Sequence, residues 1–414
     1  MDKKPKKKPN VLYITYDGLL DPLGESQILP YLFGLRSTFN SLRIISFEKP
    51  YLSKKLILQK RKILKIHNIY WSPLVFSDTS NILFKILDLL KMYAKAIFLN
   101  IRFKYDVIHC RSYQAMKVGM LLKKYFKLKT IFDMRGLWVD DRLDGGRWPQ
   151  NNIFYKLIYI YWKFIEKKLL ENSDYIIALT PQTKLIINQI MKKQMKNIFI
   201  IPCCADFNHF NLIDKDKKEI IRRNIGISKD SLVLSYLGSI GTFYLWEKML
   251  TFFLEVNKKY PESYFLVITK NWDHIRQESL EKKISKSIIN KIIIKSASRD
   301  EVPRLLGVSD LMLSFRKNSF SQKACSPTKI GEAFACGVPV IANRNVGDVN
   351  NIINSLNGGQ TINLDSKKEI DNIINNIEII KSKGGSILRM QSEKLLGLRK
   401  GINLYKSIYE KITK

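Results

Sequence analysis

The fold of this chain is decided by residues 326–339, which read S-P-T-K-I-G-E-A-F-A-C-G-V-P. An apolar run at 311–315 precedes this segment and a second apolar run at 338–342 follows it. The order predicts strand, polar loop, short helix and strand. A loop that feeds a helix N-terminus at the carboxyl end of a parallel strand attracts anions, because unpaired backbone N–H groups and the helix dipole point at it.

The side chains of this segment suit a nucleotide sugar. Ser326, Thr328 and Lys329 supply two hydroxyls and a cation for phosphate, and Glu332 lies one helical turn further on, where it can accept hydrogen bonds from sugar hydroxyls. Two plainer interpretations stay open. Ser326 and Thr328 could simply cap the helix, and Glu332 could be a solvated residue of an amphipathic helix.

Length and composition limit the number of domains and the class of partner. At 414 residues with 45% hydrophobic residues, the chain is long enough for two domains of about 200 residues each. Its formal charge of +33 favours an anionic partner, which could be nucleic acid, an anionic membrane surface or a phosphorylated substrate. Abundant Lys, Asn and Ile would equally fit an AT-rich genome.

The cysteines and the start of the chain indicate the compartment. Five cysteines form no C-x-x-C pair, which argues against zinc or a disulfide framework and for a reducing compartment. The opening M-D-K-K-P-K-K-K-P has charge but no apolar core of the signal-peptide type. No apolar run approaches the ~18–20 residues that span a bilayer. We therefore expect a cytoplasmic protein that can lie on the inner face of the membrane.

The strand–loop–helix order repeats along the chain and predicts an α/β fold with parallel sheets. The expected strands are residues 11–16, 42–47, 106–110, 129–132, 175–179 and 197–201, then 232–237, 264–268, 292–295, 311–315 and 338–342. Residues 202–210, P-C-C-A-D-F-N-H-F, form the expected hinge. The expected parts are a basic tail at 1–9, a first Rossmann-like domain at 10–203, a second at 204–388 with a ligand cleft between the two, and a helix at 389–414.

This order, with its hinge and the segment at 326–342, resembles the GT-B glycosyltransferases of the family 4 type, also called group 1 glycosyl transferases. The resemblance runs from Val11 to about Tyr409. It implies that a UDP- or GDP-linked sugar binds the second domain and the acceptor binds the first, and that the last helix returns to the first domain. It further implies that the sugar is transferred with retention of anomeric configuration, with no cofactor other than the nucleotide sugar as co-substrate, and no metal.

In the second domain the resemblance assigns donor-binding residues. Glu332 matches the second glutamate of the family's E-x7-E motif, while the first would fall at Ala324 and is missing. Gly238 allows close backbone approach to a phosphate, and Ser239 stands where the family often has an arginine. Arg316, at the end of the strand 311–315, is a candidate to supply the missing charge.

In the first domain the resemblance assigns three positions. Gly24 would place a backbone N–H near the departing phosphate. His109 fits the first histidine of a frequent H-x-H motif, although a packed strand histidine is the simpler interpretation. Arg111 replaces the second histidine and could bind the donor phosphate or an acceptor anion.

The loop at 132–148 is dense in charged and aromatic residues. Asp133 and Arg135 follow a strand, where they would face the cleft as catalytic residues together with Arg111 and Asp141. Trp138 could stack on a sugar face, and Asp140 or Asp141 could contact the acceptor hydroxyl; the sequence does not rank the two. The alternative is a surface loop with local ion pairs, which contribute little to stability.

These residues favour a transferase acting on a hydroxyl of a glycan or lipid-linked acceptor. Basic amphipathic segments at 54–65, 82–102 and 153–170 resemble surfaces that rest on anionic lipids, or are core helices with a solvated lysine face. Two rival interpretations remain. An inactive GT-B scaffold or partner subunit would explain the departures at Ala324 and Ser239. A nucleic-acid-binding protein would use the +33 charge, but no RNA- or DNA-binding motif supports it, so nucleic acid is not the expected partner.

Overall fold

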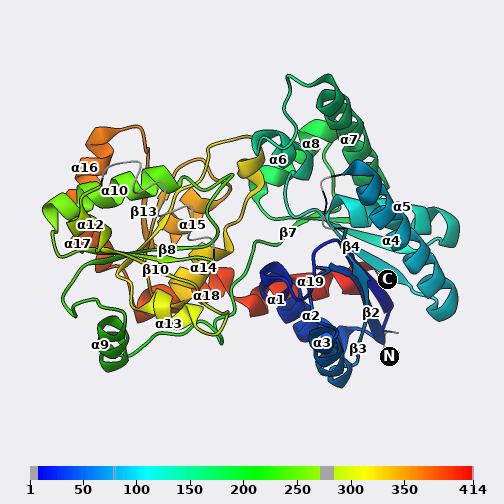
Figure 1. Cartoon of the computed structure of the whole chain (residues 1–414). Coiled ribbons are helices and arrows are strands. Elements are labelled where there is room, and N and C mark those ends of the chain that lie inside the picture. Colours follow the sequence, from blue (N-terminus) through cyan, green and yellow to red (C-terminus); the bar gives the residue numbers. More distant parts are fainter. Residues whose placement is uncertain (1–7, 78, 80, 271–283, 413–414) are drawn as a thin grey trace, which may run out of the picture. The chain divides into compact units, whose positions relative to one another are not determined.

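The computed structural model describes residues 8–77, 79, 81–270 and 284–412. Its contacts divide the chain into two compact units, a first unit of residues 1–202 with 401–414 and a second unit of residues 203–400. Each unit is a parallel sheet flanked by helices (Figure 1). Residues 1–7 of the basic tail expected at 1–9 lie outside the described residues.

The first unit holds a seven-stranded parallel sheet of order β3-β2-β1-β4-β5-β6-β7. Its strands are β1 (Asn10–Thr15), β2 (Ser41–Glu48), β3 (Ile69–Val75), β4 (Val107–Arg111), β5 (Lys129–Asp133), β6 (Tyr175–Ala178) and β7 (Ile198–Ile200). Its helices are α1 (Pro22–Gln27), α2 (Leu29–Leu35), the short η1 (Arg36–Thr38), α3 (Lys54–Ile66), α4 (Ile82–Phe103), α5 (Ser112–Phe126), α6 (Trp138–Asp144), α7 (Ile153–Asn172), α8 (Pro181–Met191) and most of α19 (Leu398–Ile412).

The second unit holds a six-stranded parallel sheet of order β10-β9-β8-β11-β12-β13. Its strands are β8 (Val233–Leu237), β9 (Tyr264–Ile268), β10 (Ile292–Lys295), β11 (Leu311–Ser314), β12 (Val340–Asn343) and β13 (Gly359–Ile362). Its helices are α9 (Lys215–Asn224), α10 (Trp246–Lys259), α12 (Lys286–Ile289), α13 (Val302–Gly307), η2 (Ser321–Ala324), α14 (Thr328–Ala335), α15 (Val349–Ser355), α16 (Lys367–Asn375), α17 (Ile377–Lys381) and α18 (Ser386–Leu396).

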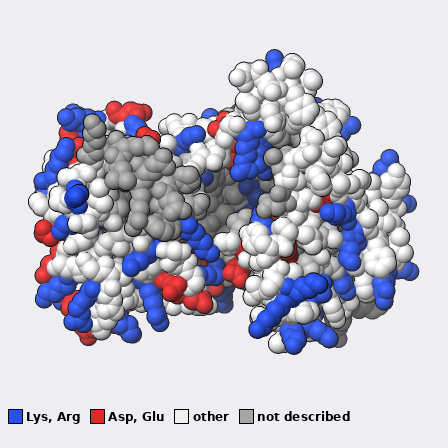
Figure 2. All heavy atoms as spheres, viewed as in Figure 1, with Lys and Arg blue, Asp and Glu red and all other residues white. Residues whose placement is uncertain are grey.

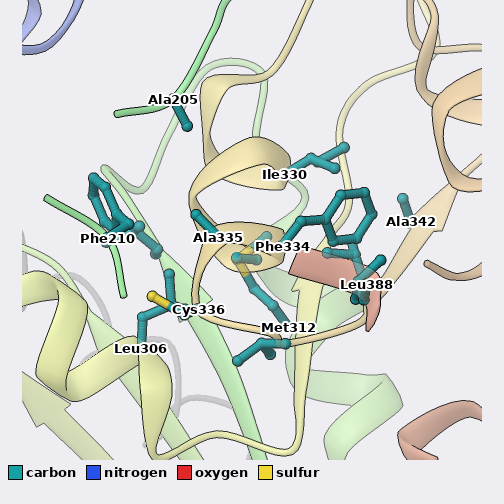
Figure 3. Close-up of a cluster of buried hydrophobic side chains, with 14 of the residues drawn as sticks. Ala205, Phe210, Leu306, Met312, Ile330, Phe334, Ala335, Cys336, Ala342 and Leu388 are labelled. Atoms are coloured by element: carbon teal, nitrogen blue, oxygen red, sulfur yellow. The ribbon is translucent and has the colours of Figure 1, made fainter. Parts of the chain in front are cut away.

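Helix α14 is anchored by a hydrophobic core of the second unit. Ile330 and Phe334 point from its inner face into a buried cluster that also contains Leu388 of α18 (Figure 3). Burying each such side chain stabilises the fold by about 1.5–3 kcal/mol. The helix ends at Ala335, and Gly337 beyond it has a φ of +70°, which favours glycine and turns the chain so that the Val338 N–H reaches the Ala333 carbonyl at 2.9 Å. The outer face of α14, which carries Lys329, is thereby held in a fixed position.

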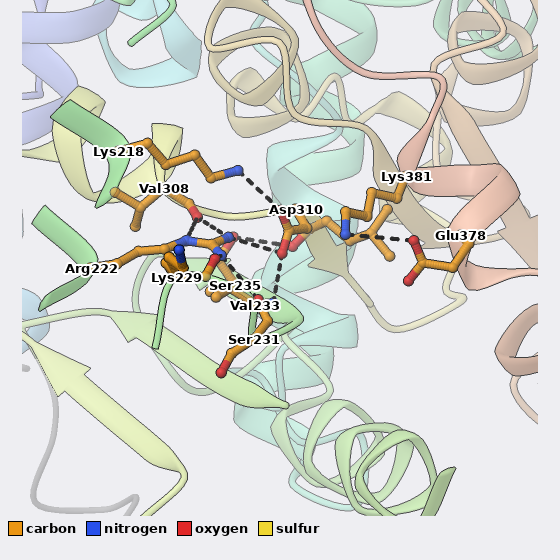
Figure 4. Close-up of polar contacts among 11 residues, drawn as sticks. Lys218, Arg222, Lys229, Ser231, Val233, Ser235, Val308, Asp310, Glu378 and Lys381 are labelled. Atoms are coloured by element: carbon orange, nitrogen blue, oxygen red, sulfur yellow. Dashed lines mark hydrogen bonds and ion pairs between the residues drawn. The ribbon is translucent and has the colours of Figure 1, made fainter. Parts of the chain in front are cut away.

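A buried ion-pair network ties α9 to the amino-terminal edge of the same sheet (Figure 4). The Arg222 guanidinium donates to the carbonyls of Val308, Lys229 and Ser231 and to the Asp310 carboxylate at 2.9 Å. Asp310 also accepts from Lys218 at 3.0 Å and from the first N–H of β8. A pocket lies among these residues, but Arg222 and Asp310 are saturated by protein groups, so the network is structural.

The end of the chain corrects one sequence expectation. A single element at 389–414 was expected to pack on the first domain, but the structure divides these residues between the units. Helix α18 packs on α14 because Leu388 and Leu396 belong to the core of the second unit. The chain is extended at Gly397, and from Gly401 onward α19 belongs to the first unit, so the returning helix itself is confirmed.

Candidate active site

The strand orders locate the candidate sites. Ligands of open parallel sheets bind outside the carboxyl ends of the strands, where the strand order reverses. In the second unit this point lies between β8 and β11, and in the first unit it lies between β1 and β4. The polar loops that the sequence singles out follow these strands or begin the neighbouring helices.

In the second unit, Lys329 and Tyr244 form the centre of the candidate donor site. The Lys329 ammonium donates to the Tyr244 hydroxyl at 2.8 Å and lies 4.0 Å from the centre of that ring. The Tyr236 hydroxyl donates to the Ser239 carbonyl at 2.6 Å, which fixes the turn after β8. The Ser239 side chain itself is exposed beside this turn.

Arg316 brings a second cation to the same tyrosine. Its guanidinium carbon lies 4.5 Å from the Tyr244 ring centre, and its Nε and Nη2 donate to Gln322 Oε1 at 2.9 and 2.7 Å. Burial alone would raise the pKa of Tyr244, but Lys329 and Arg316 outweigh burial and lower it. Two cations that converge on one phenol make a local positive field, as a diphosphate site requires.

Gly238 is required by this arrangement. Its φ is +138°, and a Cβ placed there would lie only 1.8 Å from the Lys329 Nζ atom. Any larger residue would therefore displace the lysine and strain the backbone. The prediction that glycine permits a close approach here is consistent with the geometry, although the approaching group in the structure is a side chain of the protein.

Glu332 lies on the same helix as Lys329, and its carboxylate accepts no hydrogen bond within the described part of the chain. Burial raises its pKa, and Lys329 and Arg299 only partly oppose that effect. A partly buried carboxylate without a protein donor can accept hydrogen bonds from ligand hydroxyls. Ala324, where the family motif would have its first glutamate, is fully buried and cannot take that role.

The two predicted hydroxyl ligands differ in their surroundings. The Ser326 side chain is buried, and its Oγ accepts the Cys203 N–H at 3.3 Å, so it joins the loop to the start of the second unit. Thr328 is the first residue of α14 and is partly exposed, and no side-chain hydrogen bond caps that helix. The structure thus leaves Thr328 more accessible to a ligand than Ser326.

In the first unit, Asp133 is the centre of a buried polar cluster at the end of β5. Its carboxylate accepts the Tyr405 hydroxyl of α19 at 2.9 Å and is 1% exposed. Burial alone would raise its pKa, but Arg135, His109 and Arg111 outweigh burial and lower it to about 2. The carboxylate is therefore ionised at neutral pH and surrounded by cations and hydroxyl donors.

Arg111 and Arg135 frame this carboxylate. Their nearest guanidinium nitrogens lie 3.8 Å from Asp133 oxygens, and Arg111 Nε donates to Asp17 at 3.2 Å. Arg111 Nη1 is buried with no hydrogen-bond partner in the described structure. A buried N–H donor that makes no hydrogen bond is energetically costly. Arg111 Nη1 is therefore a candidate ligand for an anion.

His109 is a packed strand histidine, as the simpler interpretation held. It is buried, its Nδ1 lies 2.6 Å from the Tyr409 hydroxyl, and burial lowers its pKa. The imidazole is thus neutral at physiological pH and supports α19.

Two further predicted residues, Asp140 and Trp138, are engaged by protein groups of the first unit. The Asp140 carboxylate is buried and accepts from Tyr159 at 2.9 Å and Lys163 at 3.0 Å, which occupies the groups expected to meet an acceptor. The Trp138 ring contacts the rings of Tyr113, Trp148 and Trp162, an aromatic packing role that the sugar-stacking prediction did not include. Asp141, in the first turn of α6, is less buried than Asp140, which ranks it above Asp140 as a contact for a ligand.

Only glycine fits at position 24, for a steric reason that is independent of any ligand. It lies in α1, and a Cβ there would lie 2.1 Å from the Gly18 carbonyl oxygen. The glycine is therefore needed for the loop after β1 to fold back on itself, whether or not a phosphate binds there.

Sequence reasoning missed several residues of these clusters, among them Tyr244, Gln322, Tyr405 and Tyr409. Tyr244 lies between β8 and α10 and Gln322 lies in the short η2, neither of them in a motif, and the two tyrosines lie one helical turn apart on the buried face of α19. That pair at i and i+4 on a helix expected to return to the first unit is the one signal that pointed to them.

The comparisons with known proteins agree with this architecture. No protein-family model and no curated protein matches the sequence. Among solved structures, sucrose-phosphate synthase from Thermosynechococcus elongatus superimposes with a TM-score of 0.71 at 13% identity, covering 97% of this chain and 98% of that one. Anabaena HepE in complex with UDP and glucose gives 0.69 at 13% identity over 98% and 100%. A Rickettsia africae glycosyltransferase gives 0.67 at 16% identity over 98% and 99%. The likeness shows the fold, and the expected GT-B fold of two Rossmann-like domains is confirmed.

Proposed function

We propose that this protein is a glycosyltransferase that moves a sugar from a UDP- or GDP-linked donor to a hydroxyl, with retention of configuration. The observation that carries the proposal is the convergence of Lys329 and Arg316 on Tyr244, beside the unpaired Glu332 carboxylate. Two cations suit the diphosphate and the carboxylate suits the ribose hydroxyls. HepE, which has the same fold, is described in complex with UDP-glucose, which supports this donor class.

The mechanism follows from charge. As the sugar–phosphate bond breaks, negative charge grows on the departing diphosphate, and Lys329, Arg316, Thr328 and loop N–H groups would stabilise it without a metal or covalent intermediate. Ala324 supplies no carboxylate at the position of the missing glutamate, so neighbouring backbone groups would have to bind the donor sugar. No cofactor beyond the nucleotide sugar is needed for this chemistry.

The first unit would bind the acceptor. Asp133 is held ionised in a buried polar cluster at the end of β5, where Arg111 Nη1 has no hydrogen-bond partner among the described residues, and the partly exposed Arg135 and Asp141 follow along the chain. Such a set can orient a hydroxyl and bind a neighbouring anionic group. We propose a glycan or lipid-linked acceptor of polysaccharide or glycolipid assembly, used in the cytoplasm at the inner face of a membrane.

The test is donor binding and hydrolysis by the purified full chain. Calorimetry across common UDP- and GDP-sugars should find one that binds, and Glu332→Gln and Lys329→Gln should each weaken binding at least about tenfold. Glu255→Gln and Lys258→Gln, which remove an exposed ion pair on α10 in the same unit, are matched controls and should leave binding unchanged. If no donor binds or is hydrolysed, the inactive-scaffold alternative, suggested by Ala324 and Ser239, replaces this proposal.

A further inference from the structure

Helix α4 is apolar on two opposite sides. Its inner side packs into the first unit through Met92, Ala96 and Leu99. On the outer side, at helical spacing, Leu83, Leu87, Leu90, Phe98 and Ile101 are between 48% and 64% exposed. A helix at a water-facing surface normally carries polar residues on its outer side. An outward apolar stripe that no other element of the described structure covers indicates an interaction surface.

Helix α7 repeats this pattern. Ile153, Leu157, Ile160 and Phe164 follow one another at spacings of four, three and four residues, and they are between 54% and 70% exposed. Its opposite side is buried through Glu166, Leu169 and Leu170. Two helices of one unit therefore expose apolar stripes of the same kind.

The two helices belong to one layer. Helix α5 contacts both α4 and α7, and all three lie together on the first unit (Figure 1). Lys117 of α5 donates to the Tyr161 hydroxyl of α7 at 3.2 Å. The two stripes therefore lie on neighbouring helices of one layer, and together they are here called the α4–α7 surface.

The charge of this layer is strongly positive. Helices α4, α5 and α7 contain eleven Lys and Arg residues and three acidic residues. Asp88 and Glu166 are fully buried and paired, so Glu171 is the one exposed acid on these helices. Figure 2 shows uncharged and basic side chains over this unit and few acidic ones on the face drawn.

Two occupants could cover such a surface, and charge decides between them. A second copy of the chain across a two-fold axis would bring the same cations against each other, which opposes association. Anionic lipid headgroups would complement the lysines while the apolar stripes enter the acyl boundary. Within the described residues, no helix has the length and apolar character to cross a bilayer, so the helices would lie in the interface plane.

We infer that the α4–α7 surface inserts into an anionic membrane interface, which deepens the proposed function by naming the face that meets a lipid-linked acceptor. The surface begins beside the candidate acceptor residues. Asp88 of α4 accepts the hydroxyl of Tyr16, the residue after β1, at 3.1 Å. Trp162 of α7 packs 4.8 Å from Trp138, five residues after Asp133. A headgroup held at this interface would thus arrive at the carboxyl edge of the first sheet.

The test is flotation of the full chain with vesicles of phosphatidylcholine, with or without phosphatidylglycerol. The wild type should float with the anionic vesicles, and added salt should weaken its binding. The triple variant Leu83→Glu, Leu87→Glu, Leu90→Glu should bind at least about tenfold more weakly. A matched control, Ile379→Glu with Ile387→Glu and Met390→Glu, replaces equally exposed residues of the second unit and should float as the wild type does.

Three outcomes would overturn the inference: flotation of the triple variant at the wild-type level, equal binding to vesicles without phosphatidylglycerol, or a dimer in sedimentation that the triple variant abolishes. Circular dichroism of the variant checks that it remains folded. Donor hydrolysis in solution is read separately, because it does not require the membrane. Loss of flotation with intact hydrolysis supports the inference, whereas flotation without any donor binding leaves this surface standing and refutes the proposed function.

Discussion

Replacing Tyr405 by Phe tests how α19 supports the candidate acceptor site. The substitution removes only the hydroxyl that donates to Asp133 at 2.9 Å, while His109, Arg111 and Arg135 remain 3.6 to 3.8 Å from that carboxylate. A hydrogen bond to a buried charged group contributes about 1.5–3 kcal/mol. We therefore expect Tyr405→Phe to reduce the free energy of opening of α19 by about 2 kcal/mol at neutral pH.

The effect has a defined pH dependence. The pKa of Asp133 is lowered to about 2, from about 3.9 in an unfolded chain. A lowered acid pKa gives stability that is fully present above about pH 5 and is lost as the pH falls towards 2. A shift of this size corresponds to about 2.5 kcal/mol. Without the Tyr405 donor the pKa of Asp133 rises, so the variant should lose less stability between pH 5 and pH 2 than the wild type loses.

Tyr409→Phe is the matched control. It removes a hydroxyl from the same helix, but its partner is His109, which burial keeps neutral, so we expect a loss of about 1 kcal/mol. Because this variant keeps the Tyr405 hydrogen bond to Asp133, its stability loss between pH 5 and pH 2 should match that of the wild type. Hydrogen exchange read by mass spectrometry on peptides of β5 and α19 measures both variants locally. Equal losses for the two variants, or a Tyr405→Phe loss that does not change towards low pH, would refute the reasoning.

Three more predictions concern the second unit. Asp310→Asn should destabilise the contact of α9 with β8 by about 3–5 kcal/mol, because it leaves the buried Arg222 charge without its partner. The control Asp216→Asn, at an exposed position of α9, should cost under about 1 kcal/mol. Local hydrogen exchange on peptides of α9 measures both variants. Burial raises the pKa of Asp348 to about 7, so its ionisation opposes folding as the pH rises from 4 to 8. Asp348→Asn should therefore raise the free energy of unfolding more at pH 8 than at pH 5, by roughly 2–4 kcal/mol, and an equal gain at both pH values would contradict this. Gly238→Ala should displace Lys329 and weaken donor binding about tenfold in calorimetry with about 1–2 kcal/mol lost in stability; unchanged affinity would show that the lysine does not bind the donor.

The sequence by itself determined most of the secondary structure, because strands and helices depend on residues that are close together in the chain. Apolar runs of four to eight residues followed by polar loops located eleven of the strands, because alternation of strand and helix is a local pattern. It missed β3 and β13, which are edge strands. Pro73 lies inside β3 and Gly359 begins β13, and both residues argue against a strand unless the edge position is known.

Only the tertiary structure decided which side chains meet. Tyr244 and Lys329 are 85 residues apart, and Tyr405 and Asp133 are 272 apart, yet each pair forms a hydrogen bond. The tertiary structure likewise showed that Asp140 is buried and bonded to Tyr159, whereas Asp141 is less buried. Sequence periodicity reports which face of an element is apolar, whereas contacts between distant residues depend on strand order and on how each helix is packed against its sheet.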